Sequence, residues 1–147
     1  MDKLKFSKSK ICEKKIEEII NESIPADSRM AFRIIFHDNK TALKKEDFYP
    51  TIMARNKNVM PDDTKQAKCE IGAFGVSVLN TYDKAVKYRE TINSLRKKSP
   101  FCFAEGKVNE NKGRISVSDE NGHYEYFLYD PIDNNPCCDF EYCKKEK

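Results

Sequence analysis

The sequence lacks any long apolar run. No stretch approaches the roughly 20 consecutive apolar residues that a membrane-spanning helix needs, so we predict no membrane segment. Residues 1–8 carry charges with no apolar stretch behind them, so we predict no secretory signal and a cytoplasmic location. Apolar residues make up only 39% of the chain and charged residues 35%, which indicates a modest core beneath a densely charged surface.

Histidine is scarce, and the cysteines are poorly spaced for a metal. There are two histidines and no Cys-x-x-Cys pair, and vicinal cysteines cannot easily direct both sulfurs at one ion. We therefore predict no metal site. Without an export signal the cysteines are expected to remain thiols, because disulfides persist mainly in oxidising compartments. They are Cys12, Cys69, Cys102, Cys137, Cys138 and Cys143.

Several familiar catalytic motifs are also missing. The chain has no Gly-rich phosphate loop, no Gly-x-Ser-x-Gly elbow and no His-Glu-x-x-His zinc motif. The pair His37-Asp38 could suggest a metal phosphohydrolase, but such a site needs more histidines than this chain has. We interpret the pair as a turn after a strand.

What the chain does contain is enough aromatic and aliphatic mass for one core. Nine Phe and seven Tyr argue against disorder, and 147 residues are a common length for one domain, so we predict a single domain over 1–147. In the first half, hydrophobic periodicity predicts a helix over 11–22 and a strand over 30–36. A short helix is expected near 46–54, interrupted or started by Pro50, followed by a long surface loop over 56–68.

In the second half of the chain, the predicted elements are a strand, a long helix and three further strands. We predict a strand over 74–79, then a helix from Asn80 or Thr81 to about residue 98. Three strands over 101–108, 114–118 and 123–129 are expected to form a meander, with turns at 111–113 and at Asn121-Gly122. The predicted class is α+β, a mainly antiparallel sheet packed against two main helices. Residues 1–10 and 131–147 are expected to be irregular tails.

Four polar residues interrupt the apolar strands: Arg33, Ser77, His123 and Glu125. A buried neutral polar group without a partner costs about 1–3 kcal/mol, and a charge costs more. Their placement therefore needs an explanation. Either they face solvent at alternate strand positions, or they meet in one catalytic site.

The segment from Phe74 to Tyr88, FGVSVLNTYDKAVKY, resembles the middle segment of ADP-ribosyltransferase-like domains. In those domains an apolar strand with a serine leads through a short polar turn into a helix that begins near an alanine. The resemblance departs from the family in two places. Val78 and Leu79 follow Ser77 where many members have a threonine and a serine, and His123 stands where many have a glutamate or glutamine.

The resemblance implies an NAD-using enzyme or toxin. It implies that Arg33 holds the dinucleotide, that Ser77 supports the site, and that Glu125 stabilises the positive charge that develops on the nicotinamide ribose. A fixed carboxylate beside an oxocarbenium-like transition state is sound chemistry in its own right.

The composition favours a different function, that of a small bacterial or phage accessory protein that binds another protein, for example in a toxin-antitoxin or defence locus. In that case no cofactor is expected. The first alternative is the NAD-using enzyme. A second is nucleic-acid binding through the basic helix at 87–98.

Two further alternatives follow from single residues. Cys69 or Cys102 could act as a thiol nucleophile with His123 as its base, although the phenylalanines beside Cys102 favour a packed thiol. The aromatic side chains over 123–129 could stack nucleotide bases, although core packing explains them more simply.

Overall fold

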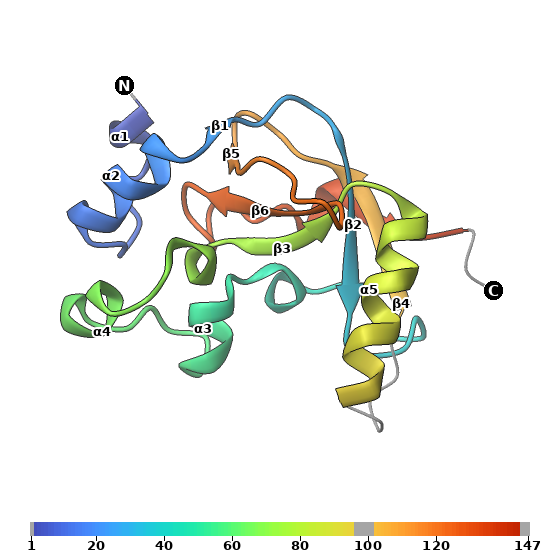
Figure 1. The fold of residues 1–147 in the computed structure, drawn as a ribbon. Helices are drawn as coiled ribbons and strands as arrows, with labels where there is room; N and C mark the ends of the chain where they lie inside the picture. Colours follow the sequence, from blue (N-terminus) through green and yellow to red (C-terminus); the bar gives the residue numbers. More distant parts are fainter. Residues whose placement is uncertain (1, 96–101, 145–147) are drawn as a thin grey trace.

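The computed structural model describes residues 2–95 and 102–144, and it confirms the predicted α+β class (Figure 1). The described strands form one antiparallel sheet of seven strands in the order β1-β5-β6-β3-β2-β4-β7. The strands are β1 (Ile24–Pro25), β2 (Met30–Ile35), β3 (Val76–Leu79), β4 (Cys102–Lys107), β5 (Gly113–Ile115), β6 (His123–Leu128) and β7 (Phe140–Tyr142).

Short helices alternate with these strands. The α-helices are α1 (Asp2–Lys5), α2 (Glu13–Asn21), α3 (Thr51–Arg55), α4 (Asp63–Ala67) and α5 (Tyr82–Leu95). The 3₁₀ helices are η1 (Lys45–Phe48), η2 (Ile71–Phe74) and η3 (Cys137–Asp139). Within the described ranges, no helix has the length and apolar character needed to cross a bilayer.

The sheet consists of two parts that meet at one point. β2 pairs with β4 at six positions and β3 pairs with β6 at four, but β2 and β3 pair only at Phe32 and Leu79. Figure 1 shows β2 and β4 running steeply across the direction of β3 and β6. Because strands that pair over one residue are free to diverge beyond it, the sheet opens between β2 and β3.

Apolar side chains pack on both sides of the sheet. Tyr124 and Tyr126 belong to one buried cluster, and Phe127 and Tyr129 belong to another. All four are at most 2% exposed. These rings are therefore unavailable for stacking on nucleotide bases.

The two longest helices are α2 and α5, which correspond to the two main helices expected. α2 buries Ile16 and Ile19, and the buried Arg114 of β5 donates to the carbonyls of Ile20 and Ser23 near the end of α2. A guanidinium there satisfies carbonyls that have no intrahelical partner. α5 begins after Thr81, whose Oγ1 accepts the Lys84 N–H at 3.1 Å, as a cap requires.

The last strands do not all follow one another across the sheet. β5 and β6 are neighbours, as predicted, but β4 lies between β2 and β7 because it pairs with β2 over all six of its residues. The Asn121-Gly122 turn has the expected positive φ, 76° at Gly122. Gly113 is needed for a different reason, since a Cβ there would lie 2.2 Å from the Phe127 carbonyl oxygen.

The prediction of a long surface loop over 56–68 is wrong for its second half, where α4 forms. Asp62 caps α4 by accepting the Lys65 N–H at 3.0 Å. Gln66 is fully buried: its Oε1 accepts the Cys12 N–H, and its Nε2 donates to the carbonyls of Lys10 and Pro61. One amide thus ties α4 to the segment before α2.

The prediction of irregular tails over 1–10 and 131–147 is wrong for residues 2–5 and 137–142, while residues 1 and 145–147 lie outside the described residues. Residues 137–142 form η3 and β7, and β7 pairs with β4, which buries Phe140. At the other end α1 precedes Phe6, whose ring packs edge-on against Tyr129 with centroids 4.9 Å apart. A buried aromatic side chain anchors each tail to the core.

Replacing Gln66 with alanine should destabilise the fold, because three backbone groups lose their partner at a buried position. We expect a loss of about 1–3 kcal/mol in the free energy of unfolding, measured by urea titration. The exposed neighbour substitution Thr64→Ala should change it by less than about 0.5 kcal/mol. Equal effects of the two substitutions would contradict the bridging role of Gln66.

Candidate functional site

Three of the four polar strand residues lie together on the paired strands β3 and β6. Ser77 stands directly opposite Glu125, and Leu79 stands opposite His123. Because side chains two apart on a strand point to the same face, His123 and Glu125 lie side by side across from Ser77. The register alone brings these three side chains together.

Their polar atoms are in contact. The Ser77 hydroxyl forms a hydrogen bond with His123 Nε2 and lies 3.5 Å from Glu125 Oε2. His123 Nε2 and Glu125 Oε2 are 3.4 Å apart. The side chains of His123 and Glu125 are 21% and 15% exposed, so the cluster is largely shielded from solvent.

Arg33 of β2 meets the cluster through the backbone of Ser77. Its neighbours Phe32 and Ile34 pack against α5, so by strand alternation Arg33 leaves β2 on the opposite face. Its guanidinium lies where β2 and β3 diverge: Nη1 donates to the Ser77 carbonyl at 2.9 Å, and Nε donates to the Asp47 carbonyl at 3.0 Å. Both partners are neutral carbonyls, and within the described ranges Arg33 forms no ion pair with a carboxylate.

The charges of Arg33 and Glu125 interact at longer range. Burial lowers the pKa of the Arg33 guanidinium, while the charges of Glu125 and Asp47 counteract this effect. Burial raises the pKa of Glu125 to about 7, against the opposing effects of the Arg33 charge and the Ser77 hydroxyl. Glu125 Oε1 is buried and has no hydrogen-bond partner among the described residues. Such a carboxyl is poised to change its charge near neutral pH.

The imidazole of His123 is held from two sides. The Tyr88 ring of α5 stacks on it in parallel, with centroids 5.6 Å apart and planes within 5°. On the far edge, Asp119 Oδ2 lies 3.7 Å from Nδ1. Burial lowers the pKa of His123, the Arg33 charge lowers it further, and Asp119 opposes this shift. The neutral imidazole is therefore the favoured form at neutral pH.

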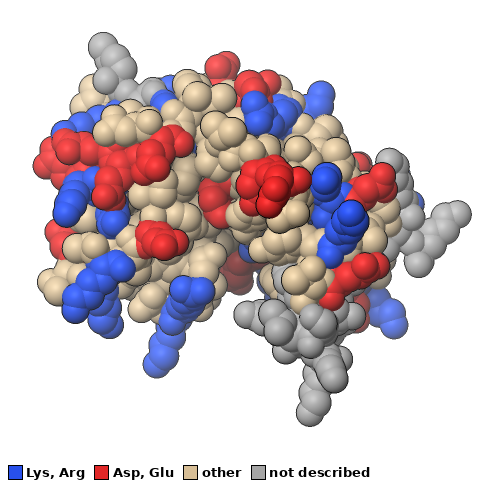
Figure 2. Space-filling model, in the orientation of Figure 1, with Lys and Arg blue, Asp and Glu red and all other residues tan. Residues whose placement is uncertain are grey.

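A cleft of about 640 Å³ adjoins the cluster, between β2, α3 and α5. The residues that line it include Arg33, Ser77, Tyr88, Tyr49 and Arg55. In Figure 2 the surface is indented between the positions of α3 and α5. Ligand sites commonly have volumes of roughly 300–1,000 Å³, so the cleft can hold a small molecule.

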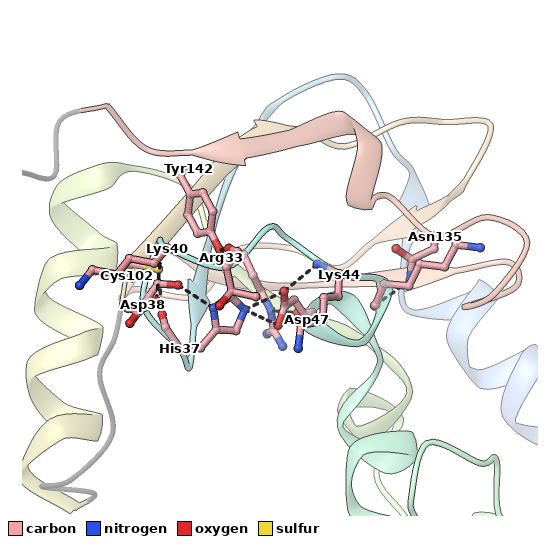
Figure 3. A network of polar contacts seen from close by, with 11 residues as sticks. Arg33, His37, Asp38, Lys40, Lys44, Asp47, Cys102, Asn135 and Tyr142 are labelled. Atoms are coloured by element: carbon pink, nitrogen blue, oxygen red, sulfur yellow. Dashed lines mark hydrogen bonds and ion pairs between the residues drawn. The ribbon is translucent and has the colours of Figure 1, made fainter.

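A second polar network forms part of the cleft wall (Figure 3). His37 Nε2 lies 3.0 Å from each carboxylate oxygen of Asp47, and Nδ1 lies 2.7 Å from the Asp38 carbonyl. Both ring nitrogens therefore face acceptors, which suits the imidazolium form. The hydrogen bond that His37 donates to the Asp47 carboxylate raises the pKa of His37. Since the Asp47 carbonyl also binds Arg33, His37 steadies the segment that holds the guanidinium.

The structure thus brings the side chains of Ser77, His123 and Glu125 into contact, whereas Arg33 contacts only the backbone of Ser77 and acts on His123 and Glu125 through its charge. It does not bring a cysteine to His123: the Cys102 thiol donates to the His37 carbonyl, and the Cys69 thiol donates to the Lys65 carbonyl. None of the six cysteines, all of which lie within the described ranges, forms a disulfide. In residues 2–95 and 102–144, no three His, Cys, Asp or Glu side chains group as metal ligands do.

Sequence reasoning missed the residues that position the cluster. A tyrosine in a predicted helix is ordinary, and no pattern in the sequence marks Tyr88 as a neighbour of His123. Asp119 had a usable signal, because an aspartate that begins a turn accepts backbone N–H groups two to four residues on. It accepts those of Asn121 and His123 at 2.8 and 3.1 Å.

Comparisons of this chain with protein-family models, curated proteins and solved structures found no match. The geometry of the cluster and the cleft is therefore the basis for the function proposed below.

Gly75 should prove necessary for the position of Glu125. A Cβ at Gly75 would lie 2.7 Å from Glu125 Cβ, whereas a Cβ at Gly72 would meet its nearest neighbour, Glu125 Oε2, at 3.9 Å. Gly75→Ala should therefore lower the free energy of unfolding by about 1–3 kcal/mol. Gly72→Ala should cost less than about 1 kcal/mol. Urea titration of both variants tests this, and equal stabilities would contradict it.

The two histidines should titrate on opposite sides of their ordinary pKa of 6.5, because His37 is raised and His123 is lowered. A raised folded-state pKa stabilises the fold below pH 6.5, and this contribution is lost as pH rises through the folded value. A lowered folded-state pKa, as for His123, stabilises the fold above pH 6.5, and this contribution is lost as pH falls through the folded-state pKa.

NMR titration of the two imidazole signals measures both values, with His37→Gln and His123→Gln to assign them. With only two histidines in the chain, the spectrum is simple. Coincident midpoints at 6.5 would mean that neither imidazole has the environment described above.

Proposed function

We propose that the protein is an ADP-ribosyltransferase-like enzyme that cleaves the bond between nicotinamide and ribose in NAD. Arg33, Ser77 and Glu125 would form its core. NAD is then a substrate, which binds in the cleft beside Ser77. We prefer this function to protein binding, because only the composition of the chain favours protein binding.

The observation that carries the proposal is the pairing of Ser77 with Glu125. A glutamate buried in a sheet, opposite a serine and near an arginine, costs free energy that packing alone does not repay. Glu125 Oε1 has no hydrogen-bond partner among the described residues, and its pKa is raised to about 7. Perturbed carboxyls of this kind concentrate at catalytic sites.

The chemistry needs one fixed negative charge. When the bond from ribose to nicotinamide breaks, the electron pair leaves with nicotinamide, and positive charge develops on the ribose. Ionised Glu125 would stabilise that charge, and Ser77 would hold the carboxylate in place through its contact with Oε2. Water or an acceptor nucleophile then completes the transfer.

The cleft offers groups that suit a dinucleotide. Arg33 and Arg55 supply positive charge for phosphate oxygens, and Arg33 retains N–H donors beyond the two that bind carbonyls. Tyr49 and Tyr88 line the same space and offer aromatic surface for a ring. The volume of about 640 Å³ accommodates a ligand of this class or a large part of it.

A nucleic-acid function has less support. On the face shown in Figure 2, basic and acidic side chains are interspersed, with acidic ones gathered over α2. Of the basic helix expected at 87–98, residues 96–98 lie outside the described residues. Nucleic-acid binding commonly uses a contiguous basic stripe.

The experiment is an assay of nicotinamide release from NAD. Glu125→Gln should lower the rate about 10²–10³-fold, the scale for losing one preorganised electrostatic group. The wild-type rate should rise with pH through about 7, as Glu125 ionises. Arg33→Lys should mainly weaken binding, because it keeps the charge but loses the planar fork of donors.

Glu120→Gln is the matched control, because Glu120 is an exposed glutamate of the turn before β6. It should leave both the rate and the stability unchanged. Circular dichroism and urea titration establish that Glu125→Gln is folded. If the wild-type protein neither releases nicotinamide nor binds NAD in calorimetry, the proposal fails.

A further inference from the structure

The contact between Ser77 and His123 has no part in the cleavage of NAD proposed above. There the carboxylate of Glu125 carries the chemistry, and Ser77 only supports it. An imidazole nitrogen hydrogen-bonded to a serine hydroxyl is, however, the arrangement that activates serine for nucleophilic attack. We propose that Ser77 is also a nucleophile, with His123 as its base, in the hydrolysis of small carboxylic esters.

The cluster supplies the three parts that such an activity needs. Ser77 is one of the residues that line the cleft, which places the serine beside a space that a small substrate can occupy. His123 Nε2 is in hydrogen-bond contact with that hydroxyl. Asp119 Oδ2, 3.7 Å from Nδ1 on the far edge of the ring, completes the order serine, histidine, carboxylate.

Two features keep the imidazole aimed at Ser77. Asp119 Oδ1 accepts the backbone N–H of His123 at 3.1 Å, so the same carboxylate fixes the turn and faces the ring. Tyr88 stacks in parallel on the ring and limits its rotation. Asp119 and Tyr88 are therefore positioning residues.

The protonation states also fit. Burial lowers the pKa of His123, so the ring is neutral at pH 7 and able to accept a proton. In the tautomer that carries its proton on Nδ1 toward Asp119, the Nε2 lone pair faces the Ser77 hydroxyl. The Arg33 charge acts on both His123 and Glu125, so it also favours negative charge that develops at Ser77.

The reaction balances without any other reactant than water. Ser77 Oγ attacks the ester carbonyl carbon while its proton passes to His123 Nε2. The bond to the alcohol oxygen breaks, and the alcohol leaves with that proton. Water then attacks the acyl-serine with His123 again as the base, which releases the carboxylic acid and restores Ser77.

The probe is an alkyl fluorophosphonate, which modifies activated serines, with peptide mass spectrometry to locate the adduct. We expect the folded wild-type protein to be labelled at Ser77 and the Ser77→Ala variant to remain unlabelled. His123→Gln should slow labelling by about 10²-fold or more, the scale for losing a general base. Ser118→Ala, a change at a half-buried serine just before the turn, should leave the rate unchanged.

Asp119→Asn separates a positioning role from a purely structural one. Asparagine keeps an oxygen for the turn but removes the charge that raises the pKa of His123. The midpoint of the pH profile of labelling should therefore move to lower pH. An unchanged midpoint would overturn the role of Asp119.

The nucleophile proposal is overturned if the folded protein is not labelled, or if the adduct lies on another serine. It is also overturned if protein unfolded in urea is labelled at the same rate as folded protein. Should His123→Gln fail to fold, the wild-type pH profile decides: labelling must fall as pH drops through the pKa of His123 measured by NMR, and a flat profile overturns the proposal. Nicotinamide release and Ser77 labelling are separate measurements, so either function can fail without the other.

Discussion

The cleft exists because β2 and β3 pair at one position only and diverge beyond it. Phe32 and Leu79 hold the two parts of the sheet together, and beyond them the strands diverge. The Arg33 guanidinium lies in that opening and ties its two walls, the Ser77 carbonyl on β3 and the Asp47 carbonyl in η1. A side chain without a charge or without five donors could not bridge both carbonyls and still present N–H groups to a ligand.

The arrangement around Arg33 is costly, and the surrounding residues compensate for only part of the cost. A charge out of water needs a partner, yet Arg33 has neutral carbonyls close by and carboxylates only at longer range. Burial is also unfavourable for the ionised form of Glu125, and it raises the pKa of this carboxyl to about 7. Partly compensated charges of opposite sign on either side of a serine are a feature of functional sites more than of stable cores.

Much of the fold could be predicted from the sequence, because hydrophobic periodicity and capping signals are local. The strand at β3, the cap at Thr81 and the turn at Gly122 follow from a few adjacent residues each. The place of β4 beside β2 could not be predicted, because strand order depends on pairings between distant segments. α4 was missed because its one buried residue, Gln66, is polar and gives no apolar period.

The candidate site divides in the same way. Arg33, Ser77, His123 and Glu125 stood out because each breaks an apolar strand, which is visible in the sequence. Tyr88 and Asp47 did not stand out, because a tyrosine in a helical stripe and an aspartate in a polar segment are ordinary in sequence. Their importance comes only from the neighbours that the fold gives them.

The close approach of β3 and η2 to Glu125 has an evolutionary consequence. With Glu125 Cβ only 2.7 Å from where a Cβ of residue 75 would lie, the two positions cannot vary independently. Among relatives of this chain, a larger residue at position 75 should occur together with a loss or shortening of the side chain at position 125. Covariation of positions 75 and 125 would identify the relatives that no longer have the buried glutamate.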